Sequence, residues 1–511
     1  MSQCMDSELL EKELITHTIN YISKIATYVK PQELLYIAID GIPPNAKILQ
    51  QRKRRFVGSW RQTIIDKKRL ECNVAFTQWD RNAITPGTQF MNKLSDSLQA
   101  HFSGSSKFPY NIILSDSSQP GEGEAKILDY IKDTPIPLEA DVIYGLDADL
   151  IMLGLLSNSN NIFLLREPVH YDMKVSIPFM LFNITLLRHY VSVECGLEDV
   201  DHEGNAILNA STYDKNTVWD YVVLCFLQGN DFMPSLSFLK IRHNGIEMTV
   251  EIYKKIRSEL NQYLVVREKH TKRFEVNYMF LVKILECLKS NEDQYMCEAE
   301  DEYYSRKMPF VGRKHPVDRL AFEIDNYPSL NKFPRIICPE KPGWRLRYYH
   351  SLFHETTEIH EINDVCLNYL EAIQWTTDYY FNRCLSRDWY FKYNYGPTVM
   401  DLHNFLLINL EDTKTFVESS IQTRYPKIKY DTDLQLLMCL PPSSCHLLKG
   451  ELKRVMHDVE LGCVHLYPKT FKFTGYLKSY LWEAHPDLPL VDPTYLSRIK
   501  NELMSTLPRF A

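Results

Sequence analysis

The amino-acid sequence predicts an α/β fold, with a mostly parallel β-sheet covered by helices on both faces and a largely helical second region. Two observations carry this prediction. In the first half of the chain, short continuous apolar runs alternate with amphipathic helical patterns, which is typical of buried parallel strands joined by crossover helices. From about residue 200 the apolar runs give way to helical patterns.

The expected strands are short apolar runs rich in β-forming residues. They are Leu34–Ile39, Asn111–Leu114, Val142–Gly145 and Ile162–Leu165. Strands that are buried on both faces appear as continuous apolar runs and lack polar alternation. The helical patterns between these runs cover Glu11–Tyr28, Ala46–Lys68 and Glu122–Ile131.

The later part of the chain predicts mainly helices. The helical patterns are Trp219–Leu227, Ile246–Leu264, Tyr278–Leu288 and Asn363–Asn382. A chain of 511 residues exceeds one ordinary core, so more than one packed region is expected. The polar stretch Glu298–Pro316 is the candidate boundary, which gives a nuclease-type core over 1–315 and a mostly helical region over 316–511.

Composition restricts the class of protein. The formal net charge is −7 at pH 7, whereas nucleic-acid-binding proteins usually have a basic balance; a site built from carboxylates would lower this total. The apolar runs are far shorter than the ~18–20 residues of a membrane span, and Met1–Ile15 is acidic and does not resemble a signal peptide. We expect an intracellular monomer without membrane attachment, in the cytoplasm rather than the nucleus.

The twelve cysteines are scattered singly, without a CxxC pair. The nearest approach to a metal cluster is Cys439, Cys445 and His446, whose spacing fits no common zinc site. We expect reduced, mostly buried thiols.

Acidic side chains follow the expected strands and one apolar helix, where an open α/β sheet binds its ligands. They are Asp40, Glu122, Glu124, Asp147, Asp149 and Asp231. A single such residue is more often a helix cap or a turn residue, but four separate acidic signals favour a shared site.

Carboxylates that lie close together raise one another's pKa unless cations neutralise them. Hard divalent ions do so through oxygen ligands; Mg²⁺ is the usual ion beside phosphate and Mn²⁺ is the alternative. Two such ions about 4 Å apart can activate water and stabilise the leaving oxygen of a phosphodiester. The six acids therefore predict a metal-dependent phosphodiesterase site.

A strongly basic helix is expected directly after Asp40. Pro43 and Pro44 break the chain, and Asn45 is the expected N-cap. At 100° per residue, one arc of roughly 100° holds three cations and an amide, which would grip a terminal phosphate. These residues are Lys47, Gln51, Arg54 and Arg55, while Arg52 and Lys53 point elsewhere. A solvated charge run or a localisation signal is the alternative.

Taken together, the motifs resemble the Xrn-type 5'→3' exoribonuclease family. In the first half they are AIDGIPPNAKILQQRKRRF, PGEGEAKILDYI, YGLDADLIMLGL, LLRE and LCFLQGNDFMPSL. In the second half they are PGWRLRYY, YLEAIQWTTDYYFNRCLSRDWYFKYNYGP, LLMCLPP, YPKTFKF and the following WEA. Their order and spacing hold over nearly the whole chain.

The resemblance implies a fold related to the flap-endonuclease and PIN-like nucleases, with a second region that walls the active site so that only single strands enter. It implies Mg²⁺-dependent, processive degradation of single-stranded RNA with a 5'-monophosphate, with decapping or decay factors as candidate partners. By motif, the six acids match the family's metal site and Lys47, Gln51, Arg54 and Arg55 match its 5'-phosphate pocket. Trp482 is the candidate for stacking on the 5'-terminal base, with a core tryptophan as the alternative.

The chain also departs from the family pattern. Family members usually begin with a Gly-Pro-Phe-Phe-type stretch, followed by a strand with a further metal-site Asp and a His that stacks on the first base. Met1–Lys30 offers no counterpart to that Asp or His. Three explanations stay open: an upstream start, a strand supplied by another chain, or lost catalysis. The alternative function is therefore a catalytically impaired relative that binds 5'-phosphorylated RNA without cutting it; a DNA flap nuclease is disfavoured.

Overall fold

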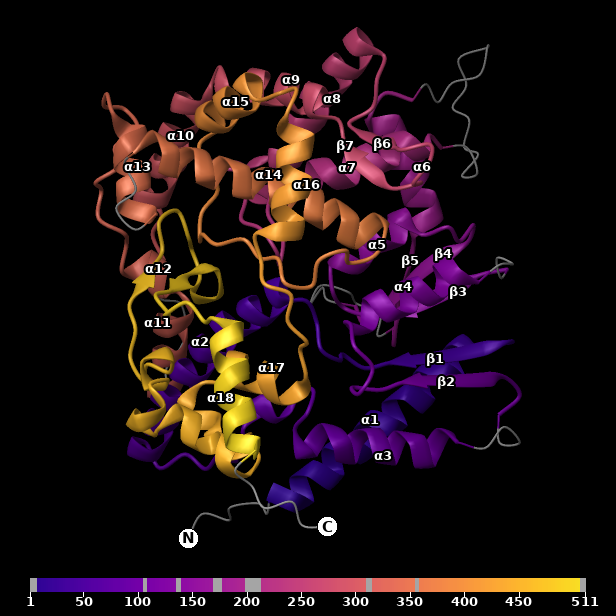
Figure 1. Cartoon of the computed structure of the whole chain (residues 1–511). Helices are drawn as coiled ribbons and strands as arrows, with labels where there is room; N and C mark the ends of the chain where they lie inside the picture. Colours follow the sequence, from indigo (N-terminus) through magenta and orange to yellow (C-terminus); the bar gives the residue numbers. More distant parts are fainter. Residues whose placement is uncertain are drawn as a thin grey trace. The chain divides into compact units, whose positions relative to one another are not determined.

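The computed structural model describes residues 7–103, 108–134, 139–168, 177–197, 213–308, 315–353 and 358–505. The chain divides into two compact units. Unit 1 comprises Met1–Gly123, Cys297–Trp344 and Pro426–Ala511, and unit 2 comprises Glu124–Met296 and Arg345–Tyr425. Each unit contains chain from both sides of the boundary expected after residue 315, which stays a prediction. Figure 1 labels the elements that are described below.

Unit 1 contains a short parallel sheet with two helices packed on it. Strands β1 (Leu34–Ala38) and β2 (Asn111–Ser115) pair in parallel from Leu34 opposite Asn111 to Ala38 opposite Ser115. Helices α1 (Ser7–Val29) and α3 (Gln89–Phe102) bury Ile15, Leu94 and Leu98 in one core with Ile37 of β1. Figure 1 shows both helices below the strand pair. This packing fixes the carboxyl end of β1, which leads to Asp40.

The long helix α2 (Asn45–Glu71) forms the rest of unit 1 with the C-terminal part of the chain. Ile48 and Phe56 lie in a core with α17 (Thr432–Cys439) and α18 (Pro493–Ser505). Further along, Val57 and Ile65 pack against α11 (Pro316–Asp325). The remaining elements are α12 (Tyr327–Leu330), β8 (Phe473–Thr474), β9 (His485–Pro486) and short 3₁₀ turns at Arg81–Ala83, Pro442–Leu447, Gly450–Met456, Val459–Leu461, Val464–Leu466 and Leu481–Glu483.

Unit 2 contains a second short sheet. Strands β3 (Asp141–Tyr144) and β4 (Ile162–Arg166) are parallel, and β5 (Met180–Asn183) pairs with β4 in antiparallel fashion. Helices α5 (Asp149–Leu156) and α6 (Ile184–Glu194) pack against β4. Helix α4 (Gly123–Asp133) enters unit 2 before β3.

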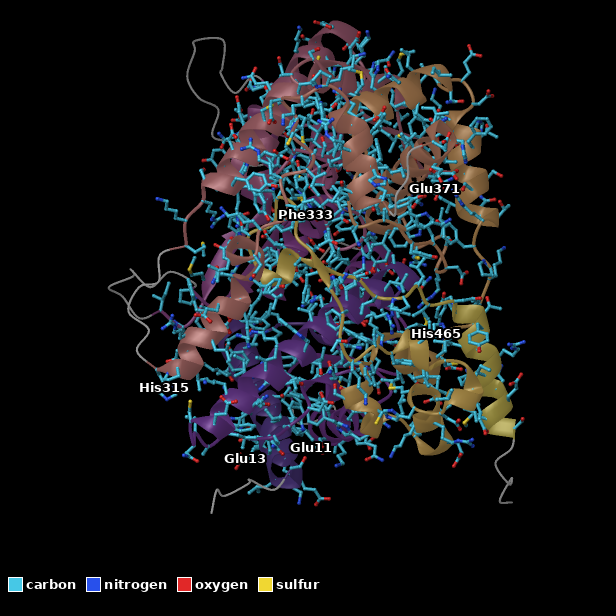
Figure 2. The ribbon with its side chains drawn as sticks, turned by 90° about the vertical axis from the view of Figure 1, so that its left-hand side faces the viewer. Glu11, Glu13, His315, Phe333, Glu371 and His465 are labelled. Atoms are coloured by element: carbon cyan, nitrogen blue, oxygen red, sulfur yellow. The ribbon has the colours of Figure 1, made fainter. Side chains whose placement is uncertain are left out.

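The helical part of unit 2 is built around α14 (Ile359–Phe381), which is buried along most of its length. Its neighbours are α7, α15, α16 and the ribbon of β6 and β7. Glu371, near the middle of α14, is fully buried and accepts hydrogen bonds from Trp389 Nε1 (3.0 Å) and Asn368 Nδ2 (2.8 Å); Figure 2 labels it among the interior side chains. The bounds are α7 Lys215–Phe226, α8 Gly245–Leu260, β6 Val265–Arg267, β7 Phe274–Val276, α9 Tyr278–Lys289, α10 Glu292–Ser305, α13 Trp344–Leu352, α15 Val399–Ile408 and α16 Thr413–Thr423, with a 3₁₀ turn at Ile241–His243.

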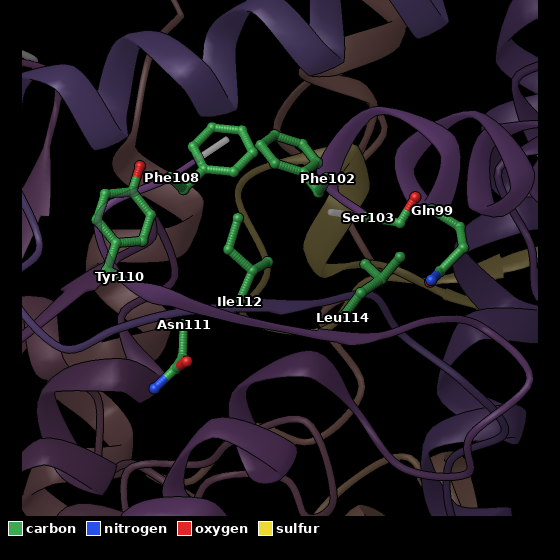
Figure 3. Close-up of a pocket in the computed structure, with 8 residues that line it drawn as sticks. All are labelled: Gln99, Phe102, Ser103, Phe108, Tyr110, Asn111, Ile112 and Leu114. Carbon is green, nitrogen blue, oxygen red and sulfur yellow. The ribbon is translucent and has the colours of Figure 1, made fainter. Parts of the chain in front are cut away.

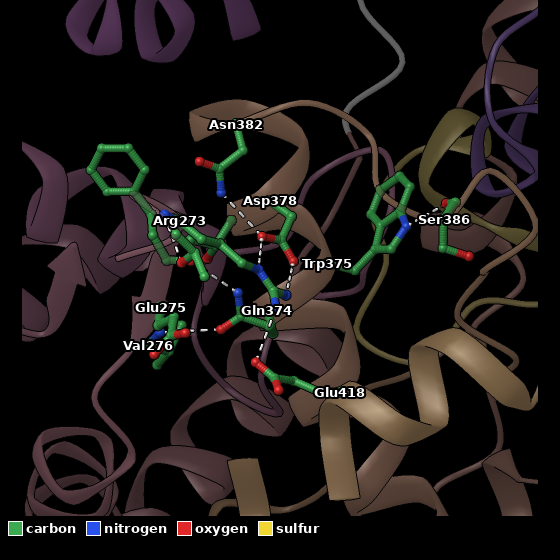
Figure 4. A network of polar contacts seen from close by, with 12 residues as sticks. Arg273, Glu275, Val276, Gln374, Trp375, Asp378, Asn382, Ser386 and Glu418 are labelled. Carbon is green, nitrogen blue, oxygen red and sulfur yellow. Dashed lines mark hydrogen bonds and ion pairs between the residues drawn. The ribbon is translucent and has the colours of Figure 1, made fainter. Parts of the chain in front are cut away.

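A partly buried ion-pair network holds the last turns of α14 in place. Arg273, just before β7, donates from Nε and Nη2 to the two carboxylate oxygens of Asp378 at 2.8 and 2.5 Å, and from Nη1 to Glu418 of α16 at 2.9 Å. Gln374 accepts from Val276 N at 3.1 Å (Figure 4). Arg273 therefore joins β7, α14 and α16. Its partner Asp378 lies two residues before Tyr380 on α14.

The predicted α/β class is confirmed, and the four expected strands and seven expected helices form close to their expected bounds. Each unit carries two of the short sheets described, and strands β5 to β9 are additions that the sequence pattern does not predict. The expected N-cap at Asn45 is wrong, because Pro44 with φ −61° and ψ 159° takes that position and Asn45 is the first helical residue. The cysteines of the described segments are free thiols. Among the residues described, no helix is both long and apolar enough to cross a membrane.

Candidate active site

In unit 1, Asp40 lies just beyond β1, on a loop that is joined to the Pro120–Gly123 loop. Asp40 is exposed, and its Oδ1 accepts a hydrogen bond from Gly123 N at 2.7 Å. The backbones also pair, from Gly41 N to Gly121 O at 2.8 Å and from Gly121 N to Ile42 O at 2.9 Å. A Cβ on Gly41 would lie 1.7 Å from Gln119 O, so only glycine permits this approach. The glycines of both motifs therefore serve to bring two acidic loops together.

Glu122, on the second of these loops, forms an ion pair with Lys47 of α2. Lys47 Nζ lies 2.5 Å from Glu122 Oε1, and both residues are buried. A buried charge of either sign is costly alone, and pairing offsets part of that cost for both side chains. The structure thus pairs a residue expected to bind phosphate with a residue expected to bind metal.

The other basic residues of α2 differ widely in exposure. Arg54 is exposed, Gln51 and Arg55 are half-buried, and Arg55 Nη1 donates to Cys439 Sγ at 2.5 Å. Arg52, which the helical arc places off this face, points into the core: it donates to Met438 O at 2.9 Å, and burial lowers its pKa to about 10. Of the four residues in the predicted phosphate pocket, Arg54 is therefore the one open to solvent.

In unit 2, three of the predicted acids interact electrostatically with the hydroxyl of Tyr380, near the end of α14. Tyr380 is 2% exposed, and its hydroxyl donates to Asp149. Burial, then the charge of Asp149 and the hydrogen bond to it, then the charges of Glu124 and Asp231 raise the pKa of Tyr380 well above its ordinary value. Acids from α4, α5 and the loop after α7 thus lie around one phenol.

Local contacts explain how these elements reach Tyr380. Lys132 of α4 donates to Tyr380 O at 3.2 Å and to Asn382 O at 3.3 Å, which ties α4 to the end of α14. The loop that carries Asp231 is held by Phe232, whose ring packs against Tyr379 at 4.9 Å and against Tyr380 at 6.4 Å. The position of Lys132 at the C-terminus of α14 is favourable, because the helix dipole attracts a cation there.

Asp147 and Asp149 follow β3 as predicted. Asp149 is the first residue of α5, and its backbone N donates to Asp147 Oδ1 at 3.2 Å. Asp147 is exposed, whereas Asp149 is half-buried. The motif therefore has one acid directed to solvent and one in contact with Tyr380.

The six predicted acids fall into two sets, and each is described within its own unit. Asp40 and Glu122 belong to unit 1, and Glu124, Asp147, Asp149 and Asp231 belong to unit 2. In the part of the chain that is described, no three His, Cys, Asp or Glu side chains lie close enough to hold one ion. Their oxygen donors suit Mg²⁺ or Mn²⁺, and the metal site stays a prediction.

Trp482 is not a core residue, so that alternative is wrong. It is 72% exposed and stacks on Tyr480, with ring centroids 6.1 Å apart and planes 8° apart. An exposed, stacked indole is suited to a base, although the stacking role itself stays a prediction.

A cavity in unit 1 lies apart from these residues. It measures ≈ 210 Å³ between α3 and β2, and Figure 3 shows that its walls are mainly aromatic and aliphatic. Among the residues that the structure describes, its lining has neither an acidic nor a basic side chain: Gln99, Phe102, Ser103, Phe108, Tyr110, Asn111, Ile112 and Leu114. This cavity cannot supply the chemistry that the acids predict.

The sequence pattern does not identify Tyr380 as a site residue, because a tyrosine within an aromatic-rich helix is usually interpreted as part of the hydrophobic core. Its place in the stretch Tyr369–Pro397, which carries part of the family resemblance, is the available signal. It also misses the pairing of Lys47 with Glu122, since the two residues come from motifs that are distant in sequence.

Comparison with known proteins agrees with the motifs. Residues 2–168 match the family described as XRN 5'-3' exonuclease N-terminus, and residues 212–329 and 338–509 match the Xrn1 helical domain. The chain is 28% identical to 5'-3' exoribonuclease 1 of Homo sapiens over 94% of this chain and 30% of that protein. It is 26% identical to a 5'-3' exoribonuclease 2 homolog of Drosophila melanogaster, over 94% of this chain and 62% of the relative.

A third relative, 5'-3' exoribonuclease 2 of Candida albicans, is 26% identical over 94% of this chain and 64% of its own length. The chain thus spans from under a third to just under two thirds of these relatives. Both family regions occur in order and cover most of its residues. The chain belongs to the Xrn family of 5'-3' exonucleases.

Proposed function

We propose that this protein degrades single-stranded RNA from a 5'-monophosphate end by Mg²⁺-dependent hydrolysis of phosphodiester bonds. The observation that carries the proposal is the arrangement of Glu124, Asp149 and Asp231 around the hydroxyl of Tyr380. Side chains from three separate elements are gathered there, at the carboxyl ends of strands and at the end of a helix. Membership of a nuclease family supports the same chemistry.

The role of each group follows from its environment. Carboxylates repel one another unless a cation neutralises them, and bound Mg²⁺ would do so here and would polarise the phosphate under attack. Tyr380 holds Asp149 in one orientation through its hydroxyl. A phenol that donates to one carboxylate oxygen leaves the other oxygen of that carboxylate for a different partner.

The preference for a 5'-monophosphate is assigned to the exposed end of the basic face of α2. Arg54 is exposed there and offers the forked donors that suit a phosphate dianion. Lys47 and Arg55 already contact Glu122 and Cys439. Arg54 is accordingly the residue whose loss should alter the choice of RNA end.

The test is digestion of matched RNAs that carry a 5'-monophosphate, a 5'-hydroxyl or a 5'-triphosphate, with Mg²⁺ or with EDTA. We expect selective loss of the monophosphate RNA, only with Mg²⁺. The Asp149→Asn protein should digest it about 100-fold more slowly or worse, the order seen when an electrostatic group of an active site is removed. Tight, selective binding of monophosphate RNA without digestion would instead support a binding protein.

A further inference from the structure

Arg55 of the basic helix contacts a sulfur atom on a neighbouring helix. Its Nη1 donates to Sγ of Cys439, the last residue of α17, at a distance of 2.5 Å. Cys439 is fully buried, whereas Arg55 is half-buried. The guanidinium of Arg55 therefore lies at the boundary between the core of unit 1 and solvent, and the thiol is on its inner side.

A second contact joins the same two segments. Ser59 Oγ and Ser443 Oγ lie 2.5 Å apart in a hydrogen bond. Ser59 follows Arg55 by four residues, so both side chains lie on one face of α2, and Ser443 follows Cys439 by four residues. This face of α2 thus runs along the end of α17 and the segment after it. The contact between Arg55 and Cys439 is part of that packing and is not an isolated pair.

The end of α17 is held firmly against the basic helix. Arg52 donates to Met438 O at 2.9 Å, and Tyr467 Oη donates to Leu437 O at 2.8 Å. Carbonyl groups in the last turn of a helix lack a partner within the helix, so these bonds satisfy them. Cys439 is therefore fixed in position before any ligand binds.

The sulfur is suited to orienting a cation without neutralising it. Burial raises the pKa of Cys439, while the charges of Arg55 and Arg52 oppose that rise, so the group is a neutral thiol at neutral pH. A thiol is a weak acceptor, and Arg55 keeps its full charge for a phosphate. Lys47 differs, because the carboxylate of Glu122 offsets its charge.

The contact with Cys439 leaves most donors of Arg55 for a ligand. A guanidinium has five N–H donors in one plane, and the bond to sulfur uses one of them. Within the described segments, the one hydrogen bond of this side chain goes to Cys439. Fixing one edge of the plane also fixes the direction of the remaining donors, which lowers the entropy lost when they bind an anion.

We propose that Cys439 is a positioning residue of the 5'-phosphate pocket: its sulfur holds Arg55 so that the remaining guanidinium donors bind the terminal phosphate beside Arg54. This inference deepens the proposed function and rests on it for the identity of the ligand. It gives Arg55, a half-buried member of the basic face, a defined orientation and names the residue that sets it. Cys439 itself does not touch the RNA.

The test compares RNAs that differ only in a 5'-monophosphate or a 5'-hydroxyl, first by affinity in EDTA and then by digestion with Mg²⁺. Cys439→Ala should reduce the preference for the monophosphate about fivefold, which corresponds to about 1 kcal/mol for one hydrogen bond. KM for monophosphate RNA should rise while kcat stays unchanged, because only binding of the end is affected. Affinity for 5'-hydroxyl RNA should not change. Cys439→Ser, which keeps a neutral acceptor, should restore most of the preference.

The matched control is Cys463→Ala, because Cys463 is a fully buried thiol of the same core and its Sγ donates to Leu461 O at 3.3 Å. It should lower the temperature of unfolding about as much as Cys439→Ala does, but it should keep the wild-type preference. A double substitution tests the route of the effect. Once Arg55→Gln is present, Cys439→Ala should not reduce the preference further, since substitutions of two residues in contact are not additive.

The outcomes separate the positioning role from the proposed function. If the wild type digests monophosphate RNA selectively and Cys439→Ala keeps the same preference as Cys463→Ala, the positioning role is overturned and the function stands. Additive effects of Cys439→Ala and Arg55→Gln on the preference would also overturn it. If the wild type binds monophosphate RNA selectively in EDTA but digests nothing, while Cys439→Ala lowers that selectivity, the positioning role is supported and the nuclease function is overturned.

Discussion

At the scale of single residues, Tyr380 contributes one polar atom to the acids of unit 2. Its hydroxyl donates to Asp149 from a buried position. Tyr380→Phe removes only that oxygen, so the ring contacts with Phe232 and Phe226 remain. A hydrogen bond to a charged group contributes about 1.5–3 kcal/mol, and we expect the rate of RNA digestion to fall about tenfold or more. RNA affinity in EDTA should stay unchanged.

The control for that variant is Tyr295→Phe, a tyrosine of unit 2 whose ring packs on Phe238. It should digest RNA at the wild-type rate. Equal rates for Tyr380→Phe and Tyr295→Phe would remove Tyr380 from the candidate site.

Arg54 gives a second residue-scale prediction. Because it is the exposed member of the basic face, Arg54→Ala should reduce the preference for 5'-monophosphate over 5'-hydroxyl RNA by about tenfold, as expected for one charge-assisted contact. Competition between the two RNAs in one reaction measures this ratio directly. Lys67→Ala, on the same helix, should keep the wild-type ratio. An unchanged ratio in Arg54→Ala would show that Arg54 does not contact the 5'-phosphate of the RNA.

At the scale of elements, one arginine secures the end of α14. Arg273 pairs with Asp378, which is 1% exposed. Removing one partner of a buried ion pair leaves an uncompensated charge and costs about 3–5 kcal/mol. We therefore expect Arg273→Gln to lower the free energy of unfolding by about that amount in urea denaturation. The variant should also digest RNA more slowly, because Asp378 and Tyr380 lie on the same turn of α14.

Arg383→Gln is the matched control, since Arg383 pairs with Asp133 at 2.6 Å on the exposed surface of the same unit. Exposed pairs contribute about 0–1 kcal/mol. If both substitutions cost the same, the network around Asp378 does not hold α14 more firmly than a surface pair would.

The elements also show what sequence can and cannot predict. Strands β1 and β4 follow from continuous apolar runs of β-forming residues, which are a local signature of a strand. Strand β5 lies in an apolar stretch that continues directly into α6, so the pattern does not mark it as a separate strand. In the structure Leu181 and Phe182 are exposed, and β5 pairs antiparallel with β4. The acids of the candidate site are predictable because each follows a strand or a helix. The Lys47–Glu122 pair and the phenol of Tyr380 are not, since they depend on contacts between segments that are distant along the chain.

At the scale of the whole molecule, stability should depend on the ionisation of Asp220 on α7. This buried side chain accepts from Leu264 N at 2.8 Å, Val265 N at 2.7 Å and Tyr253 Oη at 2.9 Å. Burial raises its pKa to about 7, whereas an unfolded Asp titrates near ~3.9. Between these values the folded chain holds one more proton than the unfolded chain, so stability falls as the pH rises through that window.

From pH 6 to pH 8 this group should lower the free energy of unfolding by about 1.4 kcal/mol, since the slope is complete at pH 6 and vanishes above the folded pKa. Asp220→Asn cannot ionise; it should be less stable at every pH, because its amide group faces backbone donors, but its pH dependence should be flatter by that amount. Urea denaturation of both proteins at pH 6, 7 and 8 measures the difference. Parallel curves would show that Asp220 keeps one protonation state throughout, and that its three hydrogen bonds stabilise the charge more than burial opposes it.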